Sequence, residues 1–212
     1  IILDKFYAAW THTFYNDLHM SFIGGYPEEM FSGLGGEVLY RPFHSRLAFG
    51  AEGWQVWKRD PDTIWGTGLT DYNVFSGHMS VWYDMPINGL TLQGRFGRFL
   101  AKDTGGTLSL TKRFRNGTRL EGYLTFTDGK DRALFGNQSR LAQGIRLNMP
   151  LGRYKHIPEG VSTKLLVEPF QRNTGRTLEN PLPLYHMTEP FSKRHMIEYW
   201  DEILPVKPQK TP

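Results

Sequence analysis

The sequence predicts an all-β fold in which an antiparallel meander of about ten strands forms a transmembrane β-barrel. Apolar and polar side chains alternate with a period of two, through runs that are longer than usual strands. Short connections rich in Gly, Asn and Pro join several consecutive runs. Aromatic residues gather near the ends of the runs, where a membrane barrel places its interfacial girdles.

The longest predicted strands are residues 46–60, 72–85 and 90–100. They are about 11–15 residues long, whereas strands of soluble proteins most often have about five or six. A tilted strand needs about 9–11 residues to cross a bilayer. One face of these runs is apolar and is expected to touch lipid; it carries Leu47, Phe49, Phe75, Met79, Val81, Leu92 and Phe96.

The other predicted strands follow the same alternation. In chain order they are residues 5–14, 18–26, 37–41, 107–114, 119–128, 144–150 and 162–170. Residues 30–36 are Gly-rich and are predicted to be irregular, and residues 129–142 are predicted to form a polar loop. Asn116 and Gly117 separate two alternating runs, which is a strong hairpin signal because both turn positions need a positive φ.

The alternation ends near residue 170. Residues 1–170 are therefore predicted to form the β-barrel domain, and residues 171–212 a polar C-terminal tail rich in Pro and charged residues. Within the tail, residues 194–204 have the spacing of one short amphipathic helix.

The composition is compatible with a wet barrel. Of 212 residues 39% are hydrophobic, 14% are aromatic and 23 are Gly, as expected when only one face of a wall is apolar, although a Gly-rich soluble sandwich would look similar. The net charge of +4 comes without a Lys/Arg block, so no nucleic-acid partner is predicted. No apolar run reaches the length of a membrane-spanning helix. The chain begins without Met or a signal peptide, so we expect a mature product or a fragment.

Alternation alone does not decide which face is outside. A soluble β-sandwich would bury the apolar face, and a membrane barrel would present it to lipid. Aromatic residues near strand ends favour the membrane, and they are Tyr26, Tyr40, Trp57, Trp65, Tyr83, Phe99, Phe114 and Phe126. Arg98 and Lys112 share the apolar parity but lie near strand ends, so we expect them at the lipid headgroups.

The polar face is expected to line the lumen. Its candidate ligand-binding residues are Arg46, Glu52, Trp54, His78, Trp82, Arg95, Arg113, Glu121, Tyr123 and Arg146. One hypothesis is a mostly basic wall that binds an anionic or hydroxyl-rich glycan, with Arg side chains pairing with carboxylates. The other is a narrow barrel filled by its own salt bridges, without a ligand.

Three motifs occur together in this chain: GGEVLYRP at residues 35–42, DYNVFSGH at 71–78 and GRFLAKDTG at 97–105. In this combination the chain resembles the YjbH family of bacterial outer-membrane lipoproteins linked to exopolysaccharide or capsule biosynthesis. The resemblance covers residues 3–150, and more weakly extends to 169, and it corresponds to a C-terminal portion of longer members. It implies a β-barrel in the bacterial outer membrane that takes part in polysaccharide export or assembly. The implied partners are outer-membrane lipid, an exopolysaccharide and other proteins of the export machinery.

No catalytic residues, cofactor or metal site are predicted. The seven His residues are scattered without metal-ligand spacing, and no nucleophile or phosphate-binding motif is present. Two alternatives remain open. One is an outer-membrane barrel enzyme acting on lipid A or glycan, for which Ser76, His78 and Ser80 form the one available cluster. The other is a soluble carbohydrate-binding β-sandwich.

Overall fold

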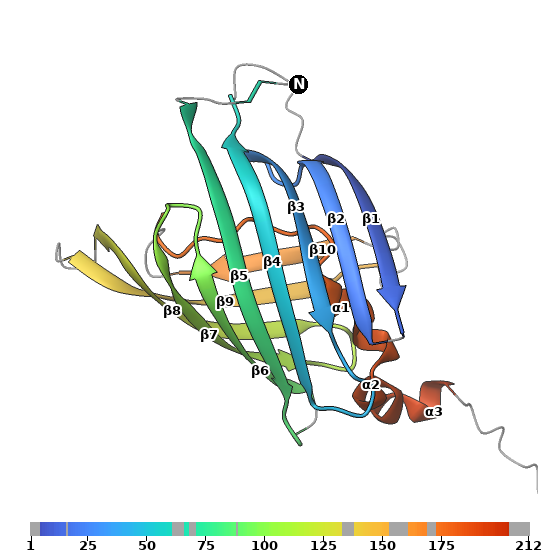
Figure 1. Ribbon diagram of the computed structural model, residues 1–212. Helices are drawn as coiled ribbons and strands as arrows, with labels where there is room; N and C mark the ends of the chain where they lie inside the picture. Colours follow the sequence, from blue (N-terminus) through green and yellow to red (C-terminus); the bar gives the residue numbers. More distant parts are fainter. Residues whose placement is uncertain are drawn as a thin grey trace, which may run out of the picture.

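The computed structural model describes residues 5–15, 17–60, 66–67, 71–87, 89–132, 138–152, 161–168 and 173–203. Its strands form one antiparallel sheet in sequence order (Figure 1). They are β1 (Phe6–Phe14), β2 (Leu18–Tyr26), β3 (Phe31–Tyr40), β4 (Leu47–Lys58), β5 (Asn73–Asp84), β6 (Leu90–Arg98), β7 (Thr104–Arg113), β8 (Arg119–Arg132), β9 (Gln138–Pro150) and β10 (Ser162–Val167). The predicted all-β antiparallel meander of ten strands is confirmed within these residues.

The chain ends in short helices after the sheet. They are α1 (Leu184–Thr188), the 3-10 turn η2 (Glu189–Phe191), α2 (Lys193–Glu198) and α3 (Trp200–Ile203). The single helix predicted for residues 194–204 is therefore divided, since Tyr199 separates α2 from α3. None of the helices among the described residues has the length and apolar character needed to cross a membrane.

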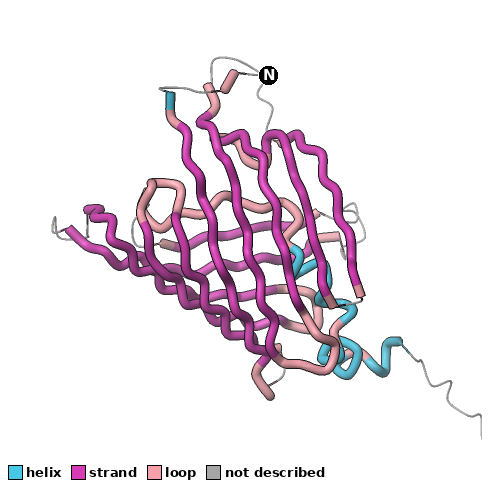
Figure 2. Tube along the Cα trace, in the orientation of Figure 1, coloured by secondary structure: helices cyan, strands magenta, loops and turns pink. Residues whose placement is uncertain are grey.

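The predicted closed barrel is not formed by these strands. Within the described residues β1 pairs only with β2 and β10 only with β9, so the sheet keeps two edges. The sheet nevertheless curves strongly, and β6–β10 pass behind β1–β5 (Figures 1 and 2). Glu179 binds Lys5, which precedes β1, at 3.1 Å and also binds Lys164 of β10. The two edges are therefore close enough for a Lys side chain from each side to reach the same carboxylate.

The two faces of the sheet differ as the alternation predicted. On β5, Met79 is 72% exposed on the convex face, whereas its neighbour His78 is 4% exposed on the concave face. The other residues expected to touch lipid also face outward: Leu47, Phe49, Phe75, Val81 and Phe96 are exposed and Leu92 is half-buried. These apolar side chains do not pack into a closed core, in contrast to what a soluble sandwich requires.

The core lies between the concave face and the C-terminal segment, residues 173–203. One buried cluster joins Trp54, Val56 and Val74 of the sheet to Leu178. A second cluster contains Leu39, Ala48 and Trp82 of the sheet, and Leu184 and Tyr185 of α1. The region predicted as a polar tail thus contributes apolar side chains to the interior, and α1 lies inside the curve of the sheet (Figure 1).

Several strand boundaries differ from the prediction. Residues 31–36, predicted to be irregular, are the first part of β3 and pair with β2 and β4. Gly35 lies under the indole of Trp54, which a side chain at position 35 would displace. Parts of the predicted loop 129–142 belong to β8 and β9, with a register irregularity between Phe126 and Asp131.

The predicted turn and rim aromatics have mixed outcomes. Phe114 N donates to Thr118 O at 2.8 Å, so the predicted hairpin is confirmed, but only Gly117, with a φ of 84°, has the positive φ that was expected of both Asn116 and Gly117. Phe99 is fully buried and packs against His78, with ring centroids 4.9 Å apart, so its assignment to the rim is wrong. Trp65 lies outside the described residues.

Candidate functional site

The concave face carries the polar side chains that the alternation assigned to it. Nine of the ten candidate residues point to this side, and they are Glu52, Trp54, His78, Trp82, Arg95, Arg113, Glu121, Tyr123 and Arg146. Arg46 differs because it precedes β4 and lies at the end of the sheet, exposed to solvent. Because the C-terminal segment covers much of this face, the site consists of the face and the segment together.

Asp84, the last residue of β5, is the centre of a buried charge network. Its carboxylate accepts hydrogen bonds from Arg194 Nη1 at 2.7 Å, from the Tyr185 hydroxyl at 2.9 Å and from the Thr91 hydroxyl at 2.9 Å. Arg41 Nη2 lies 3.4 Å from its other oxygen. Two guanidinium groups thus share one carboxylate at the junction of β3, β5 and the C-terminal helices.

Aromatic rings support the same junction. Tyr185 stacks on Trp82 with ring centroids 4.7 Å apart, and the guanidinium of Arg41 lies 4.3 Å from the centroid of the Tyr185 ring. Arg41 Nη1 also donates to the backbone oxygen of Tyr185 at 2.9 Å. The ring therefore fixes α1 between an aromatic and a cationic side chain of the wall.

A second charge network joins the end of β7 and the start of β8 to α2 and η2. Arg113 Nη2 donates to Glu198 at 2.6 Å, and its Nε lies 3.3 Å from Glu189. Glu189 also accepts from Arg119 at 2.7 Å. The backbone N–H of Gly89 donates to Glu198 at 2.9 Å, so this carboxylate holds a turn as well as a side chain.

The stretch before α1 is held by carboxylates of the wall and its connections. Glu37 on β3 accepts from Asn180 Nδ2 at 2.9 Å and from Leu184 N at 3.0 Å. Glu28 accepts from Arg176 at 3.2 Å and from Glu179 N at 3.0 Å. These bonds give partners both to backbone N–H groups of the segment and to the buried carboxylates of the wall. Buried polar groups need such partners because leaving them unpaired is costly.

Several remaining candidates contact polar or aromatic side chains on the same face. Arg146 lies 3.4 Å from Glu121, and its guanidinium is 4.2 Å from the centroid of the Tyr123 ring. His78 Nδ1 is 3.5 Å from Glu52, and Arg95 Nε donates to Ser80 at 3.4 Å. Of the hydroxyls considered for a nucleophile, Ser76 donates to the backbone oxygen of Arg98 at 2.8 Å and Ser80 accepts from Arg95. Among the described residues no group of three or more His, Asp or Glu is placed to hold a metal ion.

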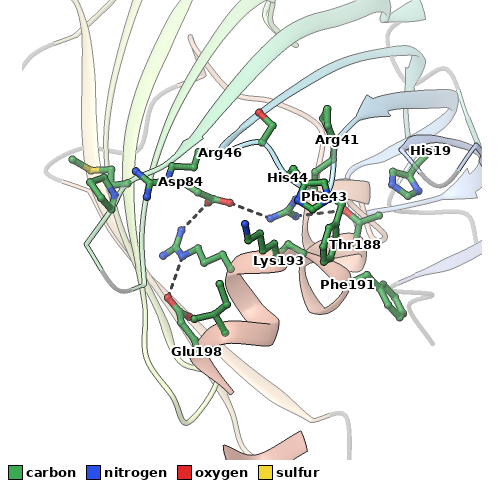
Figure 3. Close-up of a pocket in the computed structure, with 17 residues that line it drawn as sticks. His19, Arg41, Phe43, His44, Arg46, Asp84, Thr188, Phe191, Lys193 and Glu198 are labelled. Carbon is green, nitrogen blue, oxygen red and sulfur yellow. Dashed lines mark hydrogen bonds and ion pairs between the residues drawn. The ribbon is translucent and has the colours of Figure 1, made fainter. Parts of the chain in front are cut away.

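A cavity of about 360 Å³ lies at one end of the sheet (Figure 3). We call it the rim cavity, and it is bounded by the β3–β4 connection, the start of the β5–β6 connection and α2. Its polar or aromatic lining residues include His19, Arg41, Phe43, His44, Arg46, Asp84, Phe191, Lys193, Arg194 and Glu198. Only Arg46 among them was a predicted site residue. Phe191, Lys193, Arg194 and Glu198 come from the C-terminal segment, whose docking at the rim the local sequence does not specify.

Glu198 remains ionised in the folded state. Burial raises the pKa of this carboxyl, but hydrogen bonds from Gly89 N, Arg194 and Arg113 outweigh burial and leave the pKa below its usual value. A lowered folded-state pKa contributes stability above the unfolded pKa of about 4.3, and the contribution is lost as the pH falls through the folded value.

Replacing Glu198 by Gln is therefore expected to destabilise the protein in a pH-dependent way. At pH 7 the variant should lose about 1–3 kcal/mol of unfolding free energy, because Arg113 and Arg194 lose a charged acceptor. At about pH 3 the difference from the unmodified chain should be smaller, because this pH lies below the unfolded pKa of about 4.3, where the contribution of Glu198 is being lost as the pH falls towards its folded-state pKa. Chemical unfolding at the two pH values measures both differences. Glu29→Gln, at an exposed site, is the control, and an equal loss at both pH values would contradict the prediction.

Comparison with known proteins places the chain in a family. The family model YjbH, described as "Exopolysaccharide biosynthesis protein YbjH", matches residues 1–190. The lipoprotein YjbH of Escherichia coli (strain K12) is 33% identical over 179 residues, which are 82% of this chain and 25% of that protein. The chain thus spans about a quarter of the length of this curated relative. No solved structure matches it. The resemblance carried by the three motifs is confirmed, and the chain belongs to the YjbH family of exopolysaccharide biosynthesis proteins.

Proposed function

We propose that this chain forms part of the wall of a β-barrel in the bacterial outer membrane and takes part, without catalysing a reaction, in the export or assembly of an exopolysaccharide. The observation that carries the proposal is the distribution of side chains over the two faces of the sheet, which is the reverse of that in a water-soluble protein. Apolar residues are exposed across the convex face, and charged residues are buried on the concave face.

The convex face supports contact with lipid. Its exposed apolar side chains extend over strands from β1 to β10, including Trp10, Phe22, Leu34, Phe49, Phe75, Met79, Phe96, Leu108, Leu124, Phe126, Ile145 and Leu165. A surface of this extent is unusual for a protein that faces water on both sides. In a bilayer it is the expected exterior of a barrel, because every strand turns its apolar side chains to lipid.

The strand lengths also fit a bilayer. β1 to β9 have from 9 to 14 residues, and a tilted strand needs about 9–11 to cross a bilayer. Open sheet edges are costly in hydrocarbon because their backbone groups lack partners. The approach of both edges to Glu179 reduces the gap that barrel closure has to bridge.

The role in polysaccharide secretion is supported by the family. The family description names exopolysaccharide biosynthesis, and the E. coli relative is named a lipoprotein. We propose outer-membrane lipid, the exopolysaccharide and other export proteins as partners of the longer protein. A non-catalytic role is favoured because the hydroxyls of Ser76 and Ser80 are engaged in hydrogen bonds with groups of β6.

Membrane extraction tests the location. In the proposed state the chain sediments with outer membranes, resists carbonate washing, dissolves in detergent and aggregates when the detergent is removed. A monodisperse protein in buffer without detergent would instead identify a soluble carbohydrate-binding sheet and refute the membrane proposal. Deleting the chain from its host should reduce secreted polysaccharide, while unchanged secretion would refute the export role.

A further inference from the structure

The rim cavity differs in composition from the rest of the concave face. Four Arg or Lys side chains and two carboxylates line it, so it has an excess of positive charge. Its volume of about 360 Å³ lies within the range of about 300–1,000 Å³ that is common for small-ligand pockets. Figure 3 shows Arg41 and Lys193 beside Asp84, with the Arg46 side chain on the other side of Asp84 in this view.

The two carboxylates are already neutralised by protein groups. Asp84 pairs with Arg41 and Arg194, and Glu198 pairs with Arg194 and with Arg113. These acids are therefore not available to balance the other cations of the cavity.

Arg46 and Lys193 supply the uncompensated charge. In the part of the chain that the structure describes, neither side chain has a hydrogen-bonded or ion-pair partner. Both line the cavity but come from separate elements, since Arg46 precedes β4 and Lys193 is the first residue of α2. Two free cations facing one space from separate elements form a site for an anion, which each would bind by a charge-assisted hydrogen bond.

Aromatic rings border the same space. Phe191, the last residue of η2, is 71% exposed, and Phe43 in the β3–β4 connection is also exposed. Exposed apolar rings beside a few convergent polar groups are typical of small-molecule sites, where the rings supply contact area and the polar groups fix orientation. Here the rings can pack on the apolar face of a sugar while the cations bind its acidic group.

We propose that the rim cavity binds a carboxylate-bearing sugar residue of an acidic polysaccharide, a proposal that rests on the proposed function in polysaccharide export. Arg46 and Lys193 bind the carboxylate, and Phe43 and Phe191 contact the ring. A guanidinium matches a carboxylate in a two-pronged geometry, which favours a uronic acid over a neutral sugar.

The position of the cavity argues against a lipid headgroup. It is lined by Arg41 and Asp84, whose side chains lie on the concave side with Tyr185 and Arg194. The apolar surface available to acyl chains is on the opposite side of the wall, where Met79 and Phe96 are exposed. A ligand in the rim cavity is thus separated by the sheet from that surface.

Calorimetric titration of the full chain in detergent with trigalacturonate tests the proposal, with maltotriose as the neutral ligand of equal length. We expect binding of trigalacturonate that weakens with salt, and none of maltotriose. The double variant Arg46→Gln and Lys193→Gln should raise Kd about tenfold, corresponding to about 1.4 kcal/mol. The control, Arg98→Gln with Lys112→Gln on the convex parity, removes the same charge and should leave Kd unchanged.

Three other outcomes overturn the proposal. Equal loss in both double variants would show non-specific attraction to net charge. Inorganic phosphate binding in place of trigalacturonate would indicate a phosphate or headgroup site. Absence of trigalacturonate binding in a chain that still requires detergent would refute the sugar site and leave the membrane proposal intact, whereas a chain that is soluble without detergent and binds trigalacturonate would refute only the membrane proposal.

Discussion

Replacing Asp84 by Ala is expected to lower the unfolding free energy by about 3–5 kcal/mol, because it leaves Arg41 and Arg194 as buried charges without their shared carboxylate. The side chains of Asp84 and Arg41 are 11% and 7% exposed, so water does not replace the lost partner. Urea unfolding in detergent measures the loss. Asp128→Ala is the matched control, because Asp128 is exposed and accepts one hydrogen bond, from Thr104 N at 2.7 Å.

A second substitution separates charge from packing at this site. Replacing Arg41 by Met in the Asp84→Ala background removes the cation whose ion pair in the described part of the chain is with Asp84, and it should recover part of the lost stability. If Asp84→Ala instead costs no more than Asp128→Ala, the Asp84 network does not hold the C-terminal segment on the wall.

Replacing Met79 by Arg is expected to cost about 2–4 kcal/mol in lipid vesicles, because a mid-strand Arg on the outer face of a membrane barrel enters hydrocarbon. Met79 lies near the middle of β5 and is 72% exposed, so the new side chain has space and meets only the surrounding solvent. Unfolding of the two proteins in vesicles measures the difference.

The control for this substitution is Ile87→Arg. Ile87 is also exposed, but it lies in the β5–β6 connection, where an Arg costs about 0–1 kcal/mol near the interface. Equal effects at positions 79 and 87 would mean that the convex face does not meet lipid, since water accepts an Arg equally well at both.

Alternation predicted the strands and their faces wherever each position carries a distinctive side chain. On β5, Phe75 and Met79 are exposed and His78 is buried, as the period of two required. The pattern did not predict residues 31–36, because Gly33, Gly35 and Gly36 have no side chain to reveal a period. These residues pair with β2 and β4, and the ring of Trp54 packs over Gly35 from the next strand.

Only the part of the site that the sheet contributes could be predicted from the sequence. Glu52, His78 and Arg95 were assigned to the concave face by parity alone, and the structure places them there. Their neighbours from the C-terminal segment were not predicted, because Arg194 contacts Thr91 and Asp84 across 103 and 110 residues of sequence. Charge complementarity permits many such pairings, and only the curvature of the sheet selects among them.

The position of the C-terminal segment also sets an order of folding. Strands pair with their neighbours in the chain, so the sheet can grow one hairpin at a time from nearby residues. The contacts of Glu179 with Lys5 and Glu28 close loops of 174 and 151 residues, which are the entropically costly step. We therefore expect a fast phase that builds the sheet and a slower one that docks the segment, with Asp84 and Arg113 hydrated by water until docking is complete.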